Sequence, residues 1–242
     1  MSQQSTLNGI SDRCTERTLH QINEKYSPAL KCLTQFPAPP IFAMDNFLDA
    51  SECEALKRRA APFLSRSPVV QLSKNISGTP GTNQFESSAT DNSRTSETCF
   101  FSRESNKGIF AKICALTNKP LNCCELLQVG RYLPGQFYRP HFDAIDPHTD
   151  LGREFIKNGG NRIITVLIYL NDVSKGGCTY FEKLGLRVQP KQGKVIIFFP
   201  SFLNGEMDQQ TLHCAEDAVD EKWVSQIWIR QSTRIPGRPS DE

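Results

Sequence analysis

The segment Arg162-Ile-Ile-Thr-Val-Leu-Ile-Tyr-Leu170 is one of four short apolar runs in the second half of this 242-residue chain. The other three runs cover residues 126–132, 194–199 and 222–229, and glycine-containing turns separate them. Short apolar runs bounded by turn residues are typical of β-strands. We therefore predict a jelly roll or sandwich in which antiparallel strands form two facing sheets.

Two helices are predicted before these strands. Residues 41–48 indicate a short strand, and residues 49–59 indicate a helix with Asp49 or Ser51 as its N-cap. Residues 105–117 carry apolar side chains at close to helical spacing, and Pro120 would end that helix. The predicted fold class is therefore α+β, mainly β, with supporting N-terminal helices.

The chain divides into one large domain and two short ends. Residues 1–37 are polar and run into a proline-rich stretch, so we predict a flexible N-terminal arm. The domain should cover residues 38–235, with a catalytic core at 125–230 and a C-terminal tail at 236–242. Within the domain, residues 71–98 are rich in Ser, Thr, Asn and Gly, which predicts a long surface loop.

Composition excludes several classes of partner. The net charge is +2, from 28 basic and 26 acidic residues, and no dense basic cluster marks a nucleic-acid or lipid surface. No apolar stretch reaches the roughly 18 residues of a membrane span, and the N-terminus has no apolar secretory segment. The nine cysteines form no CxxC pair and indicate reduced thiols. We expect a soluble cytoplasmic or otherwise intracellular protein without nucleic-acid or membrane partners.

Three ligand-type residues indicate a metal site. In His141-Phe-Asp143, an imidazole and a carboxylate two residues apart would point to the same side of a strand. His213 lies about seventy residues later, and a jelly roll can bring such a distant strand end beside the first pair. Two imidazoles and one carboxylate leave coordination positions open, as in Fe(II) oxygenases, whereas structural zinc fills its tetrahedron with protein ligands.

Other interpretations of these histidines remain open at this point. A structural His-Asp pair would explain His141 and Asp143 equally well, and a zinc hydrolase could use Asp146 as its base. His148 could join Asp146 and Asp150 in a second metal site, although a loop residue is the simpler interpretation. His20 lies in the predicted arm and carries no hypothesis.

A longer pattern is more specific. The sequence resembles the prolyl 4-hydroxylase branch of the Fe(II)/2-oxoglutarate-dependent dioxygenases in five blocks, which appear in the family's order: residues 126–143, 162–172, 176–181, His213 and 222–225. The resemblance implies a double-stranded β-helix, a cupin-like jelly roll, with iron held by His141, Asp143 and His213. It also implies Fe(II), O2 and 2-oxoglutarate as requirements, with ascorbate as reductant.

The resemblance also implies a co-substrate site. Lys222 stands nine positions after His213, where the family has a lysine that pairs with the far carboxylate of 2-oxoglutarate, and Tyr132 and Thr165 match positions that hydrogen-bond the same ligand. Strand alternation places Lys222 and Trp228 on one face of residues 222–229. A lysine on the inner face needs an anionic partner, because burying an unpaired ammonium is costly.

The implied reaction is hydroxylation of proline at C4 in a peptide or protein, with release of succinate and CO2. By resemblance, the substrate contacts would be Arg94, Ser96, Glu125, Tyr138 and Trp228. Collagen-type members often have a histidine where this chain has Arg230, so a collagen-like preference does not follow. The alternatives are an oxygenase acting on a small molecule or another side chain, a zinc hydrolase, and a non-catalytic cupin-like binding module; solvated loop positions would explain Arg94 and Ser96 equally well.

Overall fold

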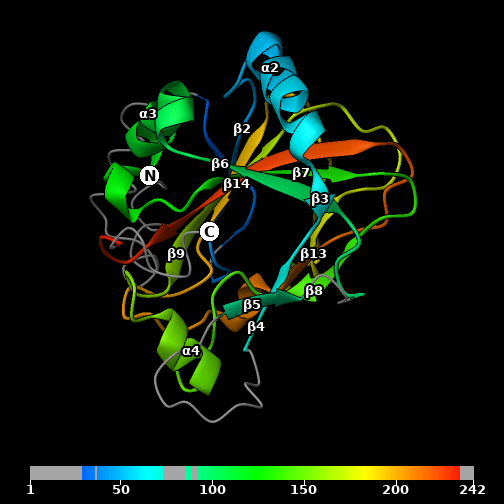
Figure 1. The fold of residues 1–242 in the computed structure, drawn as a ribbon. Helices are drawn as coiled ribbons and strands as arrows, with labels where there is room; N and C mark the ends of the chain where they lie inside the picture. The colour runs from blue at the N-terminus through cyan, green and yellow to red at the C-terminus, as the bar shows by residue number, and fades with distance from the viewer. Residues whose placement is uncertain (1–28, 36, 73–84, 89–91, 235–242) are drawn as a thin grey trace, which may run out of the picture.

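A computed structural model describes residues 29–35, 37–72, 85–88 and 92–234 of the chain. Two antiparallel sheets, one of eight strands and one of four, form the body of the molecule (Figure 1). The predicted jelly roll with its mainly β composition is confirmed.

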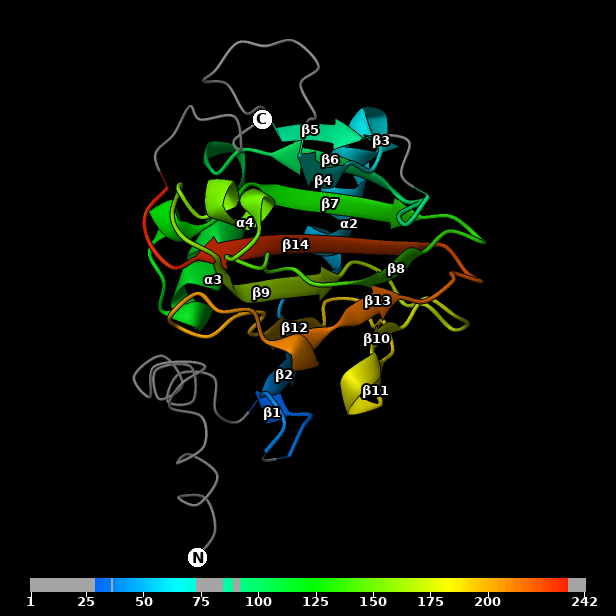
Figure 2. The same ribbon diagram turned by 90° about the horizontal axis from the view of Figure 1, so that it is seen from below.

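The large sheet contains the long strands (Figure 2). Its order is β1-β2-β12-β9-β14-β7-β6-β3, with the bounds Lys31–Cys32, Ile41–Met44, Val195–Phe198, Arg162–Tyr169, Lys222–Arg230, Leu127–Tyr132, Glu97–Phe101 and Ser65–Arg66. Strands β7, β9, β12 and β14 correspond to the four apolar runs, and each agrees with its predicted range to within one residue at either end.

The small sheet is built from strands of three or four residues. Its order is β11-β10-β13-β8, with the bounds Leu186–Val188, Thr179–Phe181, His213–Ala215 and Tyr138–His141. A separate pair joins β4 (Val69–Leu72) to β5 (Phe85–Ser88).

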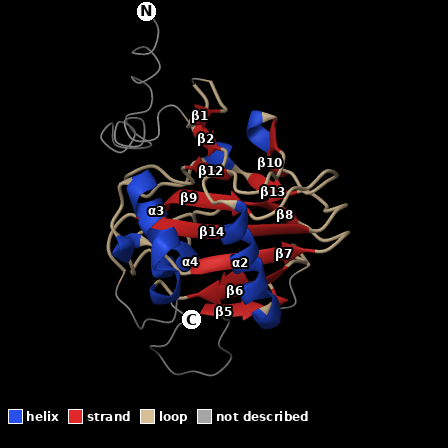
Figure 3. Cartoon of the chain, turned by 90° about the horizontal axis from the view of Figure 1, so that it is seen from above, coloured by secondary structure: helices blue, strands red, loops and turns tan. Residues whose placement is uncertain are grey.

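Helices α2 (Ala50–Ala60) and α3 (Lys107–Thr117) cover the outer face of the large sheet (Figure 3). Asp49 caps α2: its carboxylate accepts a hydrogen bond from the backbone of Glu52, and the Glu52 side chain accepts one from the Asp49 backbone. This reciprocal pair satisfies amides that a helix start leaves open, and it confirms the predicted cap. A third helix, α4 (Asp150–Phe155), was not predicted.

Two apolar cores lie on opposite faces of the large sheet. Trp223 and Ile227 of β14 pack in the outer core with α2 and α3, whereas Val224 packs in the inner core with residues of the small sheet such as Phe181. Because successive side chains of a strand point to opposite faces, the same alternation turns Lys222 inward. The predicted division of β14 into two faces is confirmed.

The predicted loop at 71–98 is wrong at both of its ends. It includes the end of β4, all of β5 and the start of β6, and Arg94 and Ser96 are buried. Strands pair through backbone hydrogen bonds, which do not require apolar side chains, so the polar composition of this segment did not indicate its strands. Residues 73–84 and 89–91 lie outside the described residues, as do 1–28 and 235–242, which include most of the predicted arm and tail. Strand β1 falls within the predicted arm.

No helix in the described ranges has the length and apolar character needed to cross a membrane.

Candidate metal and co-substrate site

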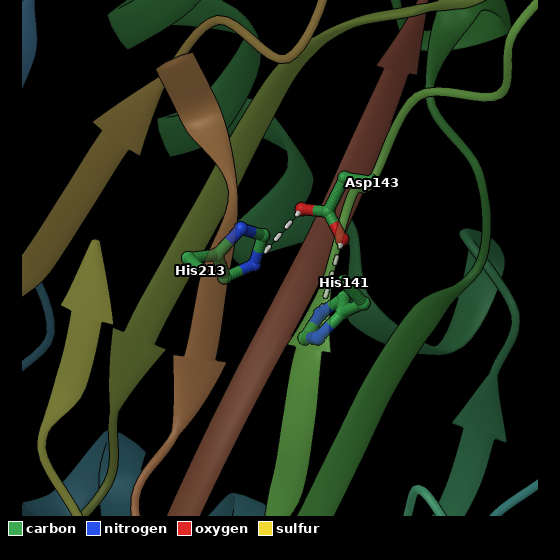
Figure 4. A group of neighbouring side chains, drawn as sticks. All are labelled: His141, Asp143 and His213. Carbon is green, nitrogen blue, oxygen red and sulfur yellow. Dashed lines mark ion pairs between the residues drawn. The ribbon is translucent and has the colours of Figure 1, made fainter. Parts of the chain in front are cut away.

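The predicted metal ligands meet at the end of the small sheet. His141 is the last residue of β8, His213 is the first of β13, and the two are paired in the antiparallel ladder. One ligand atom from each of His141, Asp143 and His213 lies within 4.8 Å of the others. Figure 4 shows the Asp143 carboxylate facing both imidazoles. Asp143 itself lies two residues beyond β8 rather than on a strand, so the prediction of a shared strand face is wrong for this residue.

Hydrogen bonds fix the tautomer of both histidines. The Nδ1 atoms of His141 and His213 lie 2.8 and 2.9 Å from the carbonyl oxygens of Arg139 and Thr211. A carbonyl oxygen can only accept, so each Nδ1 donates, and in the neutral ring the lone pair is then on Nε2. These Nε2 atoms lie 3.8 Å from the two carboxylate oxygens of Asp143. Three lone-pair donors therefore converge on one point.

The charge states also suit a metal. Burial, and then the neighbouring His213, lower the pKa of His141 to about 3, so its ring is neutral near pH 7. Burial alone would raise the pKa of Asp143, but His213, His141, Arg162 and the Thr165 hydroxyl together hold it below its ordinary value. A neutral imidazole and an ionised carboxylate are the forms that bind metal ions.

Thr165 supports the cluster from the large sheet. Its hydroxyl donates a 2.7 Å hydrogen bond to Asp143 Oδ2, and both side chains are buried. Outer-shell bonds of this kind orient a ligating carboxylate. The sequence indicated only a contact with 2-oxoglutarate for Thr165, and that contact stays a prediction.

Lys222 occupies the inner face, as predicted, and is 2% exposed. Its Nζ donates a 2.6 Å hydrogen bond to the carbonyl oxygen of Gly177 and lies 5.1 Å from the centre of the Tyr132 ring. No carboxylate in the described part of the chain forms an ion pair with it. Burial lowers the pKa of Lys222 to about 8, because the charged form loses its hydration. The structure thus places the buried ammonium group of Lys222 beside Tyr132, one of the two residues whose hydroxyl groups are predicted to hydrogen-bond 2-oxoglutarate.

Tyr138 lies directly against the metal cluster. Its ring stacks on His141 with centroids 3.5 Å apart and an interplanar angle of 14°. The Arg94 guanidinium lies 4.8 Å from the Tyr138 ring centre and donates hydrogen bonds to Ser96 and Gln128. Arg94 and Ser96 are buried, so the alternative that they are solvated loop residues is wrong.

Glu125, which the resemblance assigned to substrate contact, is paired with two arginines of the protein. Its carboxylate is buried and accepts two hydrogen bonds from Arg162, each 2.8 Å long, and one of 2.5 Å from Arg230. Burial alone would raise the pKa of Glu125, but these two arginines hold it far below its usual range. Both carboxylate oxygens are engaged within the protein, which argues against Glu125 as a direct contact for a peptide.

Sequence reasoning gave Arg162 no role, yet it links several parts of the site. Its guanidinium lies 3.8 Å from the Trp228 ring centre and donates to the backbone oxygen of Asp143 at 3.3 Å. Trp228 is paired with Thr165 across β14 and β9, so it lies beside the cluster. The sequence feature that could have identified Arg162 is its position at the head of a continuous apolar strand. An arginine that points inward from such a strand needs a carboxylate partner.

The second metal site proposed at His148 is not formed. His148 bonds Glu206 at 3.1 Å, and its side chain is 76% exposed. Asp150 pairs with Arg153. Among the described residues only the His141, Asp143 and His213 group satisfies metal-ligand spacing. His20 lies outside the described residues.

Comparisons with known proteins agree with this geometry. The family model described as the 2OG-Fe(II) oxygenase superfamily matches residues 127–230. Prolyl 4-hydroxylase 1 of Arabidopsis thaliana is 32% identical over 213 residues, which cover 80% of this chain and 70% of the plant protein. The chain belongs to the prolyl 4-hydroxylase branch of the 2OG-Fe(II) oxygenases.

Further relatives of this oxygenase span viruses and animals. The human prolyl 4-hydroxylase subunit alpha-1 is 33% identical over 210 residues, which cover 85% of this chain and 37% of the human one. A solved structure of the viral collagen prolyl hydroxylase from Paramecium Bursaria Chlorella virus-1, in a 2OG complex, aligns with a TM-score of 0.57 and 26% identity. That alignment covers 78% of this chain and 95% of the viral chain, and the double-stranded β-helix prediction is confirmed.

The chain is therefore a 2-oxoglutarate-dependent dioxygenase that uses Fe(II). Its donor set fits that metal: two imidazoles and a carboxylate leave open positions for the co-substrate and O2. When bound, the iron supplies oxygen activation at the expense of 2-oxoglutarate, and the protein supplies orientation and exclusion of water.

Proposed function

We propose that this oxygenase hydroxylates proline at C4 within a peptide or protein, with release of succinate and CO2. His141, Asp143 and His213 would hold Fe(II), and Lys222 would pair with the far carboxylate of 2-oxoglutarate. Tyr132 and Thr165 would hydrogen-bond the same ligand, and ascorbate would keep the iron reduced. The catalytic domain would cover residues 38–235, between an arm at 1–37 and a tail at 236–242.

The observation that carries the co-substrate assignment is the unpaired ammonium of Lys222. A lysine that is 2% exposed and has no carboxylate partner among the described residues is unfavourable in the free protein. A dicarboxylate would supply the missing charge. A zinc hydrolase would leave the buried Lys222 unexplained, and the family assignment also disfavours a hydrolase.

Replacing Lys222 by alanine should raise the KM for 2-oxoglutarate by about tenfold to a hundredfold. A charge-assisted pair in a buried pocket contributes about 1.5 to 3 kcal/mol, and truncation removes it. The change is measured as succinate formation over a range of 2-oxoglutarate concentrations at saturating Fe(II). An unchanged KM would contradict the assignment of Lys222.

The same lysine predicts a pH dependence. Lys222 in the free enzyme has its pKa lowered to about 8, so it loses its proton as the pH rises through that value. Only the charged form pairs with a carboxylate, so the KM for 2-oxoglutarate should be flat below pH 7.5 and rise about tenfold per unit well above pH 8. Lys222→Arg is the control, because guanidinium stays charged throughout this range and should give a higher but pH-independent KM.

The substrate assignment rests on the surroundings of Tyr138 and Trp228. Tyr138 presents an aromatic surface beside His141, and burial raises its pKa to about 12, so its phenol stays neutral. The indole Nε1 of Trp228 is buried and has no hydrogen-bond partner in the described part of the chain. A peptide carbonyl would supply that acceptor, and the two rings would pack a pyrrolidine. Arg94, whose guanidinium lies 4.8 Å from the Tyr138 ring centre, and Ser96 would complete the substrate site beside this ring.

A proline-rich peptide should stimulate 2-oxoglutarate decarboxylation far more than free L-proline does. An extended peptide adds backbone contacts that the free amino acid lacks, and such remote binding energy favours the coupled reaction. Mass spectrometry should find a single oxygen added to proline, and fragmentation with a hydroxyproline standard should place it at C4.

Trp228→Phe is the matched variant for this test. It keeps most of the aromatic surface but removes the Nε1 donor, so it should weaken peptide-dependent turnover and spare slow uncoupled consumption of 2-oxoglutarate. If free proline or another small molecule supports faster coupled turnover than every proline peptide tried, the substrate is a small molecule and the peptide assignment fails.

We also propose a reducing intracellular location. The eight described cysteines are free thiols, five of them buried. Proteins of oxidising compartments usually pair such residues in disulfides. Cell fractionation with an antibody to the protein would check the location.

A further inference from the structure

The backbone around Asp143 is held from outside its own sheet. Strand β8 ends at His141, so no ladder hydrogen bond fixes the two residues that follow. The start of β9 supplies the missing contacts: Arg162 donates to the Asp143 carbonyl at 3.3 Å, and Asn161 bonds both backbone groups of Ile145. The position of a metal ligand therefore depends on Arg162, the first residue of β9, and on Asn161 directly before it.

The amide of Asn161 uses its full hydrogen-bonding capacity. This side chain is fully buried. Its Oδ1 accepts from the backbone nitrogens of Ile145 at 3.1 Å and Arg162 at 3.0 Å, and its Nδ2 donates to the carbonyl oxygens of Ile145 at 2.7 Å and Gly205 at 2.9 Å. An amide has two donor hydrogens and two acceptor lone pairs, and all four are satisfied. Such a fully satisfied buried group specifies one geometry.

Gly205 belongs to the segment that leads into His213. The Asn161–Gly205 hydrogen bond forms a joint between two segments, and Gln231 strengthens it. The Gln231 Oε1 accepts a hydrogen bond from the Asn161 backbone at 2.6 Å, and its Nε2 donates one to the Leu203 carbonyl oxygen at 2.9 Å. At Gly205 φ is +90°, and an added Cβ would lie 2.9 Å from Gln231 Oε1, so a side chain would strain this close approach. From here the chain continues through residues 209–211 to His213 at the start of β13.

We propose that Asn161 is a positioning residue for the metal centre. One amide joins the backbone two residues after Asp143 to the backbone eight residues before His213, and so sets the separation of two ligands that come from different segments. This role rests on the proposed function of Asp143 and His213 as ligands. A metal site requires its ligand atoms to be placed within about 0.2 Å, so a loosened joint weakens binding without unfolding the sheets.

Two variants test this role, with Mn(II) as an air-stable probe of the same site. Asn161→Asp keeps the shape and both acceptor contacts but points a carboxylate oxygen at two carbonyl groups, whereas Asn161→Ala removes all four bonds. Both should weaken Mn(II) affinity about tenfold to a hundredfold, as measured by titration calorimetry well below the melting temperature. A role confined to stability would lower the melting temperature and leave that affinity unchanged.

Asn106→Ala is the matched control. Asn106 is also buried and bonds Arg59 and Ser102, but it lies at the start of α3 on the outer core. This variant should lose stability and bind Mn(II) like the wild type. Equal Mn(II) affinity in the wild type and the Asn161 variants, together with lost affinity in His213→Ala, would overturn the role of Asn161 alone.

Wild-type Mn(II) affinity in His213→Ala would instead overturn the metal site itself. If neither Asn161 variant folds, Gln231→Leu tests the same joint, because it removes the bonds to Asn161 and Leu203 from a less buried position. This variant should lower Mn(II) affinity severalfold. Unchanged affinity in a folded Gln231→Leu protein would then reject the proposal.

Discussion

Replacement of His213 by alanine should abolish 2-oxoglutarate turnover and most of the Fe(II) binding. The variant leaves only His141 and Asp143 as ligands, and the loss of a direct ligand should exceed the roughly 10- to 100-fold loss that follows removal of an outer-shell partner. Iron content after anaerobic loading and succinate formation should fall together, with the circular dichroism spectrum retained. Full activity would remove His213 from the site.

Two control variants distinguish the loss of a metal ligand from the loss of side-chain packing. His213 packs against the rings of Phe181 and Phe198, with centroids 5.4 and 4.8 Å away, so alanine also leaves a cavity. His213→Gln keeps more of the volume and should show the same loss of activity with a smaller loss in melting temperature. His148→Ala removes an exposed histidine on the surface and should behave like the wild type in both assays.

The long strands could be predicted because their side chains pack into an apolar core on each face of the sheet, and this burial gives them a continuous apolar sequence. Strand β14 lies between two apolar cores, so Trp223 and Ile227 pack on one face and Val224 on the other. Lys222 breaks this apolar pattern on the inner face. That exception, set by its spacing from His213, is what pointed to the co-substrate site.

The short strands could not be predicted, because they lack the apolar pattern that marks the long strands. Strand β13 has three residues, and β8 carries the polar, half-exposed sequence Tyr138-Arg-Pro-His141. Elements of this size owe their form to pairing with distant segments, which no local pattern records. The position of Asp143 beyond β8 depends likewise on hydrogen bonds that residues 161 and 162 form with the backbone of residues 143 and 145.

The burial of polar side chains is a second feature that the sequence did not reveal. Arg94 and Glu125 are types that usually lie at the surface, and resemblance assigned both to substrate contact. In the structure Arg94 is bonded to Ser96 and Gln128, and Glu125 to Arg162 and Arg230. Each partner is at least two residues away in sequence and most are more than thirty, so only the fold reveals that these charges are satisfied internally.

Glu125→Gln should therefore act on stability first. The substitution keeps the shape but removes the negative charge that Arg162 and Arg230 share, and leaving buried charges unpaired costs about 3 to 5 kcal/mol. Urea unfolding should show this loss at pH 7. Glu97→Gln is the matched control, because Glu97 pairs with Arg131 at a half-exposed position where such pairs contribute about 0 to 1 kcal/mol.

The pH dependence of that loss identifies its origin. The folded protein holds the pKa of Glu125 below the ordinary value of 4.5, so its contribution is fully present above that pH and is lost as the pH falls. The gap in unfolding free energy between wild type and Glu125→Gln should accordingly be largest near neutral pH and shrink in acid. The prediction fails if Glu125→Gln is as stable as Glu97→Gln and raises only the KM for a proline peptide, because Glu125 would then contact substrate as the resemblance implied.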